Sequence, residues 1–423
     1  MKSICRTHEH LSRRALLKGA LRTAGGAALM NWGGLFHSDA MANEVKKSNK
    51  RCILIWLNGG CSQFETFDMK VGRPTGGVFR EISTNVPGTR VCELMPRISQ
   101  RMDKLTVIRS MRTSQIDHPG GIYLMHTGWS RTADTRFPEI GAIVAKYCGD
   151  AESDLPNFVK ISSVGDAGSG ILGPQYQPFK LNRDGALPPF SISPLSAEHE
   201  ARRHGLRDFV ERQYAARHRA DPVRMHREAY DRARRLNNVR HVFKLDAEWE
   251  KYRDKYGDSK IGRRMMIAAR LVEAGVAFVE VGQSGYDTHA DNFEGHKSLV
   301  PPMEHAWAAL LDDLDERGLL DDTLVVWMGE IGRTPKINNR SGRDHYVRSW
   351  TTALAGGGVK GGLVYGASDK DGIDVKEDRV TEGDFFATIY TALGIDPETE
   401  NYSGVRPIPL AQFGHKVVRD ILA

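Results

Sequence analysis

Short runs of apolar and β-branched residues recur along the chain, separated by stretches with helical periodicity. Most of the runs are continuously hydrophobic rather than alternating, which is typical of strands covered on both faces. We therefore predict β-strands at Cys52–Leu57, Leu105–Arg109, Phe158–Ser162, Val276–Val281, Thr323–Met328 and Thr351–Ala355.

Amphipathic stretches between these runs predict helices. After the Pro301–Pro302 pair, apolar residues recur at helical spacing up to Leu314, with charged residues on the opposite face. The two prolines predict the first turn of this helix, and Gly318 predicts its end. Residues 257–275, "GDSKIGRRMMIAARLVEAG", predict another helix that leads directly into a strand. Alternating strands and helices predict an α/β fold with a mostly parallel, doubly wound sheet.

The stretch from about 196 to 256 differs from the rest of the chain. It is rich in Arg, His, Glu and Asp and contains no strand-like run. We predict a charged helical insertion at the edge of the sheet. Because acidic residues alternate with the arginines, a solvated helical face explains the pattern better than a nucleic-acid surface.

Composition and charge narrow the class of protein. The 423 residues are 40% hydrophobic and 26% charged, as in an ordinary globular protein, and suffice for one large α/β domain or two medium ones. The formal net charge is +6, but the first 42 residues contribute six basic and two acidic side chains. The remaining 53 basic and 51 acidic residues leave a net charge of +2. We therefore expect no nucleic-acid partner.

The same 42 residues resemble a targeting segment. "SRRALLKG", residues 12–19, resembles a twin-arginine export signal, an apolar Gly- and Ala-rich stretch follows it, and "AMA" at 40–42 offers a cleavage site. We predict a signal peptide at 1–42, an α/β domain at 43–423, and a periplasmic or otherwise exported protein. The apolar stretch is too short and glycine-rich to span a membrane, and no later segment approaches a span, so we expect no integral membrane segment.

Polar clusters follow several of the predicted strands, where open α/β sheets place their sites. Carboxylates combined with imidazoles suit zinc, manganese or iron, and carboxylate-rich sets also suit magnesium or calcium. Each cluster also has a structural explanation, such as a turn or an internal ion pair. The clusters supply Asn58, Ser62, Asp117, His118, Asp287, His289, Glu330, Asp344 and His345.

One glycine motif gives a formal match that lacks its context. "GGGVKG", residues 356–361, fits the G-x-G-x-x-G pattern, but the residues after it read as a strand rather than a helix. We therefore predict a glycine-rich hairpin at this point instead of a dinucleotide site.

Several of these segments together resemble a known family. "LNGGCSQFETFDMK", "GGIYLMHTG", "GVAFVEVGQSGYDTHADNFEGH", "LDDTLVVWMGEIGRTPKINNRSGRDHY" and "LAGGGVKGGLVYGASD" look like the bacterial, twin-arginine-exported family catalogued as domain of unknown function 1501. That family is similar to the alkaline phosphatase and sulfatase superfamily. The resemblance implies a three-layer sandwich, with helices on both faces of a mostly parallel central sheet.

The superfamily pattern also implies roles for individual residues. Its first strand ends in a metal-binding aspartate, and Asn58 takes that place here. Where the superfamily has its nucleophile, this chain offers Asp117 and His118. Cys61 lacks the C-x-P-x-R or C-x-A-x-R motif that a sulfatase needs to form formylglycine, so we do not expect that modification.

The later superfamily ligands also have counterparts. Asp287 and His289 resemble its Asp and His pair, Glu330 keeps one carboxylate of the following pair, and His345 beside Asp344 resembles its last histidine ligand.

Two hypotheses for function stay open. The first is an exported, metal-assisted hydrolase of phosphate, sulfate or related esters, acting on an anionic small molecule or polymer. It would hold at most one divalent ion (zinc, manganese, iron or calcium) through residues drawn from Asn58, Asp287, His289, Glu330, Asp344 and His345. His118 would move a proton, Ser62 could act as nucleophile, and Arg333 or Arg343 would hold the anionic group.

The second hypothesis is a metal-free, non-catalytic binding or assembly protein. It would keep the phosphatase and sulfatase scaffold in degenerate form and work with a larger exported protein partner.

Overall fold

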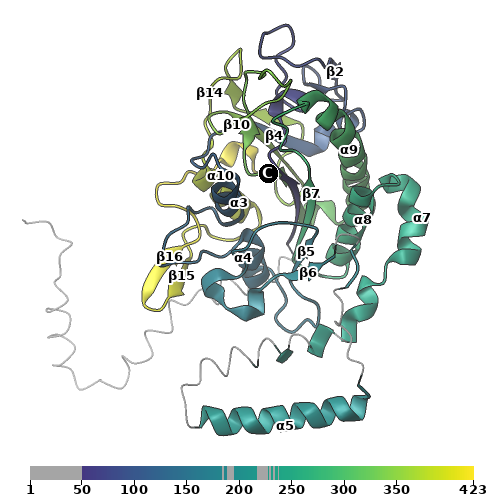
Figure 1. Ribbon diagram of the computed structural model, residues 1–423, viewed down its shortest axis with the longest axis vertical. Coiled ribbons are helices and arrows are strands. Elements are labelled where there is room, and N and C mark those ends of the chain that lie inside the picture. The colour runs from purple at the N-terminus through teal and green to yellow at the C-terminus, as the bar shows by residue number, and fades with distance from the viewer. Residues whose placement is uncertain are drawn as a thin grey trace, which may run out of the picture.

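A twisted central sheet organises the molecule (Figure 1). The computed structural model describes residues 50–182, 185–187, 195–216, 227, 230–231, 234–236 and 238–423. The sheet has eight strands in the order β12-β4-β11-β8-β1-β7-β5-β6. In chain order, the strands are β1 (Arg51–Asn58), β4 (Leu105–Met111), β5 (Phe158–Ile161), β6 (Phe179–Leu181), β7 (Phe278–Ser284), β8 (Thr323–Met328), β11 (Trp350–Ala355) and β12 (Leu363–Tyr365).

The sheet is mostly parallel, as the hydrophobic runs predict. Only β11 runs antiparallel to its two neighbours, β4 and β8, and the other strand pairs of this sheet are parallel. Every predicted strand is present, although β7 begins at Phe278, two residues later than predicted. The predicted α/β class is confirmed.

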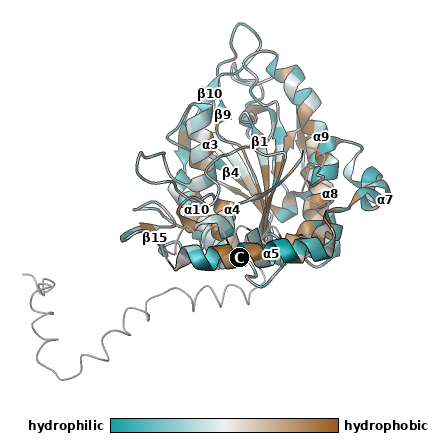
Figure 2. Ribbon diagram, turned by 60° about the horizontal axis from the view of Figure 1, so that its bottom comes forward, coloured by the Kyte–Doolittle hydropathy of each residue, from teal (hydrophilic) through white to brown (hydrophobic). Residues whose placement is uncertain are grey.

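Side chains that alternate along β1 enter two separate cores. Ile53, Ile55 and Leu57 pack in the core that includes residues of α8 (Lys260–Glu273) and α9 (Asn292–Glu316). Cys52, Leu54 and Trp56 pack in a second core with residues of α4 (Ile140–Tyr147) and α10 (Glu382–Ala392). Figure 2 shows α8 and α9 on one side of the sheet, with α3 (His118–Thr127), α4 and α10 on the other. These layers confirm the predicted three-layer sandwich.

Four small antiparallel pairs shape the loops around the central sheet. They are β2 (Glu81–Ser83) with β3 (Arg90–Cys92), β9 (Gly332–Arg333) with β10 (His345–Tyr346), β13 (Ala367–Ser368) with β14 (Val375–Glu377), and β15 (Glu400–Ser403) with β16 (Arg406–Pro409).

The predicted start of the helix after Pro301–Pro302 is wrong. Helix α9 begins at Asn292, so both prolines lie inside it, where each removes one backbone hydrogen bond. Residues before and after the prolines, such as Val300 and Trp307, are fully buried, and this packing offsets the lost bonds. Gly318, with a φ of 65°, follows the helix end as predicted.

The hairpin predicted at residues 356–361 is also wrong. β11 already has β4 and β8 on its two sides, so β12 pairs in parallel with the outer side of β4 instead. The connecting loop passes close to β8, because a Cβ on Gly357 would lie only 2.5 Å from the backbone nitrogen of Leu324. The glycines therefore allow this close crossing.

The predicted insertion at about 196–256 is helical where it is described. It contains α5 (Ala197–Ala215), the short 3-10 helix Arg240–Phe243 and α7 (Asp246–Tyr256). The predicted signal peptide at 1–42 lies outside the described residues. Within the described part of the chain, no helix combines the length and apolar character needed to cross a bilayer.

Candidate metal centre

Parallel strands bring three of the predicted site segments to one edge of the sheet. β7 and β8 flank β1, so the residues that follow these strands lie close together. Asn58 ends β1, Asp287 follows β7 and Glu330 follows β8. The last residues of β4 lead into α3, whose first residue is His118, and the β9–β10 pair brings in His345.

The glycines after β1 allow the strand ends to approach each other. Gly59 has a φ of 110°, and a Cβ there would lie 2.3 Å from the backbone nitrogen of Asp287. Only glycine tolerates both the conformation and the contact. The backbone N–H of Gly59 donates to Oε1 of the buried Glu330 at 2.8 Å. The turn after β1 therefore sets the position of two acidic residues.

Three histidines surround Asp287, and each is oriented by a hydrogen bond from its Nδ1. A carboxylate or carbonyl partner of this kind fixes the ring so that Nε2 faces the other way. His118 donates to Glu330 Oε1 at 2.8 Å, His289 to Asp344 Oδ1 at 2.7 Å and His345 to the backbone oxygen of Ile116 at 2.9 Å.

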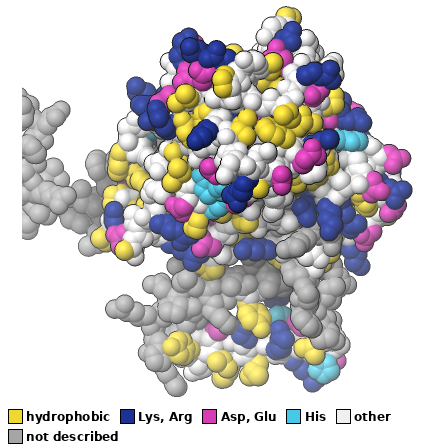
Figure 3. Space-filling model, turned by 45° about the horizontal axis from the view of Figure 1, so that its top comes forward, with side chains coloured by type: hydrophobic (Ala, Val, Ile, Leu, Met, Phe, Trp, Pro, Cys, Tyr) yellow, Lys and Arg dark blue, Asp and Glu magenta, His cyan; other side chains and the backbone are white. Residues whose placement is uncertain are grey.

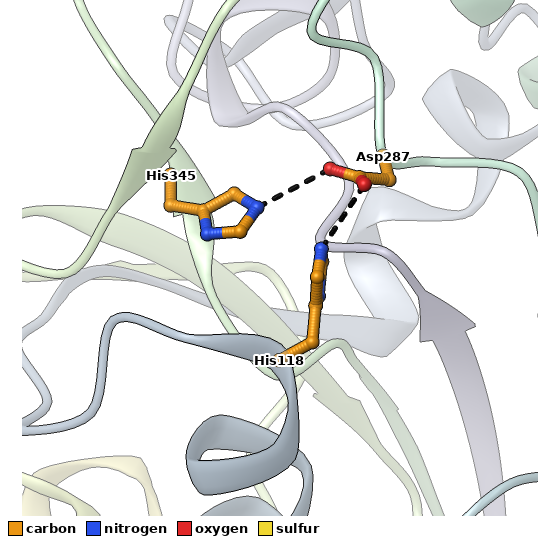
Figure 4. A group of neighbouring side chains, drawn as sticks. All are labelled: His118, Asp287 and His345. Carbon is orange, nitrogen blue, oxygen red and sulfur yellow. Dashed lines mark hydrogen bonds and ion pairs between the residues drawn. The ribbon is translucent and has the colours of Figure 1, made fainter.

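The three Nε2 atoms converge on the Asp287 carboxylate. His118 Nε2 lies 3.2 Å from Oδ2, whereas the Nε2 atoms of His289 and His345 lie 3.0 and 3.3 Å from Oδ1. The Nε2 atoms of His289 and His345 are 3.0 Å apart. Figure 4 shows how His118, Asp287 and His345 point toward one another from different elements.

Charge interactions set the protonation of these groups. Burial alone would raise the pKa of Asp287, but a hydrogen bond and charge from Arg333, with the charges of His118 and His289, lower it to about 2. The hydrogen bond to Glu330 raises the pKa of His118 in spite of its partial burial. Burial and the nearby positive charge of His118 lower the pKa of His345. The centre therefore combines a firmly ionised carboxylate with imidazoles whose pKa values are pushed in opposite directions.

The residues present fit a divalent metal ion. His118, Asp287 and His345 each offer a ligand atom, and these atoms lie within 4.8 Å of one another. With Nδ1 of each histidine used as a donor, each Nε2 offers a lone pair beside the Asp287 carboxylate whenever that nitrogen is not protonated. Imidazole nitrogens and a carboxylate are a zinc-type donor set.

Two of the predicted metal ligands have a different position from the one expected. Glu330 and Asp344 hold the Nδ1 atoms of His118 and His289, so they support the histidines rather than face Asp287. Asn58 is half-buried, and its Oδ1 accepts no hydrogen bond from the described residues.

The hydroxyl of Ser62, the candidate nucleophile, makes no hydrogen bond to His118. Ser62 is fully buried, and among the described residues its Oγ has no hydrogen-bond partner. Its backbone N–H donates to Nε2 of His296 at 3.0 Å, and His296 Nδ1 donates to the backbone oxygen of Asn292. Sequence analysis missed His296, which lies within a helical stretch and carries no motif. Burial lowers the pKa of this histidine.

Both predicted substrate-binding arginines are buried and engaged inside the protein. Arg333 donates to Asp287 at 2.7 Å and to the backbone oxygens of Gly59, Gly60 and Arg343. Arg343 is paired with the buried Glu65 at 2.9 Å and donates to the backbone oxygens of Thr75, Thr334 and Pro335. Both side chains are fully buried, so neither guanidinium is exposed to a substrate.

The fold and this centre define a three-layer α/β protein with a histidine and carboxylate cluster at the carboxyl edge of its sheet. The chain belongs to the family described as "Protein of unknown function (DUF1501)", whose model matches residues 49–422. No curated protein matches the chain.

Solved structures to which the chain is similar include a sulfatase, a phosphatase-superfamily protein and a synthase. The PsFucS1 sulfatase from Pseudoalteromonas sp. has 14% identity and a TM-score of 0.39, over 85% of this chain and 72% of that chain. A protein in the alkaline phosphatase superfamily from Vibrio parahaemolyticus has 11% identity and a TM-score of 0.37, over 86% and 76%. The lipoteichoic acid synthase LtaP from Listeria monocytogenes has 10% identity and a TM-score of 0.37, over 88% and 80%. None of these similarities assigns a reaction to this chain.

Proposed function

We propose that the protein is an exported, metal-dependent hydrolase of phosphate, sulfate or related esters. The observation that carries this proposal is the convergence of three oriented Nε2 atoms on the ionised carboxylate of Asp287. The proposal of export depends on the twin-arginine pattern at residues 12–19.

His289, His345 and Oδ1 of Asp287 would hold one divalent ion, because these three ligand atoms lie within 3.3 Å of one another. Three protein ligands leave an open position, which is the arrangement of catalytic zinc sites. When bound, the ion polarises the ester oxygen and lowers the pKa of water.

His118 faces the other oxygen of Asp287, Oδ2, and is the residue that would move a proton. Glu330 holds its Nδ1 and raises its pKa, so Nε2 carries a proton more readily. As a water oxygen forms the new bond to phosphorus or sulfur and the ester bond breaks, Nε2 would donate this proton to the leaving ester oxygen, and the proton that the water loses would go to solvent. Glu330 is fully buried, so it keeps this ring in one orientation.

Metal content tests the proposal directly. Elemental mass spectrometry of the chain exported through its own signal should find about one equivalent of a divalent metal, as expected for a three-ligand site. His345→Ala should lose this metal. His305→Ala is a matched control, because Nε2 of His305 donates to the backbone oxygen of Lys255 instead of facing Asp287.

Hydrolysis of aryl phosphates and aryl sulfates should follow the metal across these variants. A folded wild-type protein that contains no metal would rule out this mechanism. It would favour the alternative of a binding or assembly protein on the same scaffold.

A further inference from the structure

An anionic substrate needs a positive group beside the metal centre, and the two buried arginines there cannot supply it. Both side chains are fully buried, and their hydrogen bonds go to the carboxylates of Asp287 and Glu65 and to backbone oxygens. The centre itself adds the carboxylates of Asp287 and Asp344, whose side chains are about half exposed, at 45% and 54%. These carboxylates repel an anion, so a cation in addition to the metal ion and His118 would strengthen its binding.

The loop between β9 and β10 is pinned beside His289. Asn338 Nδ2 donates to the backbone oxygen of His289 at 3.0 Å, and the backbone N–H of Asp291 donates to the backbone oxygen of Arg340 at 3.0 Å. A Cβ on Gly342 would lie only 2.0 Å from the backbone oxygen of His289. The loop backbone therefore packs directly against the segment that carries one of the candidate metal ligands.

Arg340 stands on this fixed loop with an exposed side chain. Its backbone is held at both ends, because its N–H donates to Oδ1 of Asn338 at 2.9 Å and its carbonyl accepts from Asp291. Its guanidinium makes no hydrogen bond or ion pair with the described residues. Asn338, whose Oδ1 accepts from the Arg340 N–H, also donates through Nδ2 to Oδ1 of Asp344 at 3.3 Å, so Arg340 is linked to the carboxylate that orients His289. On the face shown in Figure 3, His side chains lie beside a Lys or Arg side chain and Asp or Glu side chains.

We propose that the Arg340 guanidinium binds the anionic group of the substrate beside the metal centre. This inference rests on the proposed function, because it names the residue that holds the phosphate or sulfate group at the same site. A guanidinium offers paired N–H donors that match the oxygens of these groups. The hydrogen-bonded loop backbone fixes the point from which this side chain extends, whereas the buried arginines nearby only shape the site.

Titration calorimetry with inorganic sulfate and inorganic phosphate tests the inference. We expect Arg340→Gln to weaken binding of both anions by about 10- to 100-fold, as for the loss of charge-assisted hydrogen bonds. Arg340→Lys keeps the charge but loses the paired donors. Its affinity for each anion should therefore lie between that of the wild-type protein and that of Arg340→Gln. Lys336→Gln is the matched control, because Lys336 is an exposed cation on the same loop, and it should change affinity less than about 3-fold, as for an exposed, screened charge.

Two results would overturn the inference. One is equal weakening by Arg340→Gln and Lys336→Gln, which would indicate diffuse attraction rather than contact. The other is wild-type protein that binds neither anion.

The metal content of each sample separates this inference from the proposed function. If the wild-type protein holds no metal, the hydrolase proposal fails. An Arg340-dependent anion affinity in the same sample would still support the binding site.

Discussion

The ring nitrogen that each histidine uses for its anchor determines which nitrogen faces the centre. His118, His289 and His345 all donate through Nδ1, to two carboxylates and one carbonyl. Each Nε2 is therefore left with its lone pair or its proton toward Asp287. Sequence patterns can nominate a histidine, but they do not state which nitrogen is free. Because the Nδ1 atoms are the anchored ones, Glu330 supports one ring, whereas all three rings face Asp287.

At this scale we predict that Glu330→Gln lowers the pKa of His118. The hydrogen bond to Glu330 is the largest cause of the raised pKa of His118, and glutamine carries no charge to sustain it. A general acid works below its pKa, so the alkaline fall in kcat should begin at lower pH in the variant. Imidazole NMR titration of metal-free protein measures the pKa, and a pH profile of the metal-loaded protein measures the shift in rate.

Asp344→Asn is the control for this prediction, because Asp344 contacts His289 and not His118. It should leave the pKa of His118 near its wild-type value. An unchanged His118 pKa in Glu330→Gln would contradict the assignment of Glu330 as the group that controls this ring.

At the scale of elements, a buried ionic cluster fastens α3 and α4 to β5 and β7. His126, near the end of α3, contacts Glu280 of β7 at 2.9 Å. Lys160 of β5 pairs with Glu280 at 3.3 Å and with Glu139, just before α4, at 2.7 Å. All four side chains are buried. Because α3 begins with His118 and β7 leads to Asp287, this cluster helps to set the distance between those two residues.

We predict that Lys160→Met destabilises the fold by about 3–5 kcal/mol, as for removal of one partner of a buried ion pair. The variant leaves Glu139 and Glu280 without their cation at this depth. Lys104→Met is the control, because its partner Asp315 is half exposed, and it should cost at most about 1 kcal/mol. Urea unfolding at neutral pH measures both free energies of unfolding, and equal values for the two variants would refute the prediction.

The pH dependence of stability gives this cluster a second test. Burial would raise the pKa of Glu139, but the charges of Lys160 and His126 outweigh burial and lower it. A lowered carboxyl pKa adds stability above the ordinary value of 4.5, and that stability is lost as pH falls through the folded pKa. Lys160→Met should therefore lose less stability than wild type between neutral pH and acid.

At the scale of the whole molecule, continuous apolar runs predicted the main strands because buried parallel strands need hydrophobic residues on both faces. The same runs could not place β11 and β12, since pairing order depends on which strand edges are already occupied. The start of α9 was missed because its prolines are tolerated only through the packing of residues before them. Polar residues at strand ends predicted the region of the site. The engagement of Arg333 and Arg343 depends on contacts between distant segments, which no local pattern records.

The candidate ligands come from two distant parts of the chain, Asp287 and His289 after β7 and His345 in β10, so a bound metal would link loops across the site. Ligand that binds only the folded state stabilises it by about 2.7 kcal/mol at a concentration of about 100 times Kd. For a domain of this size we expect EDTA to lower the Tm of the metal-loaded protein by about 3 °C. Differential scanning calorimetry with and without EDTA measures the change. His345→Ala should show no response to EDTA, His305→Ala should respond as wild type does, and a wild-type Tm that EDTA leaves unchanged would contradict a metal held by these loops.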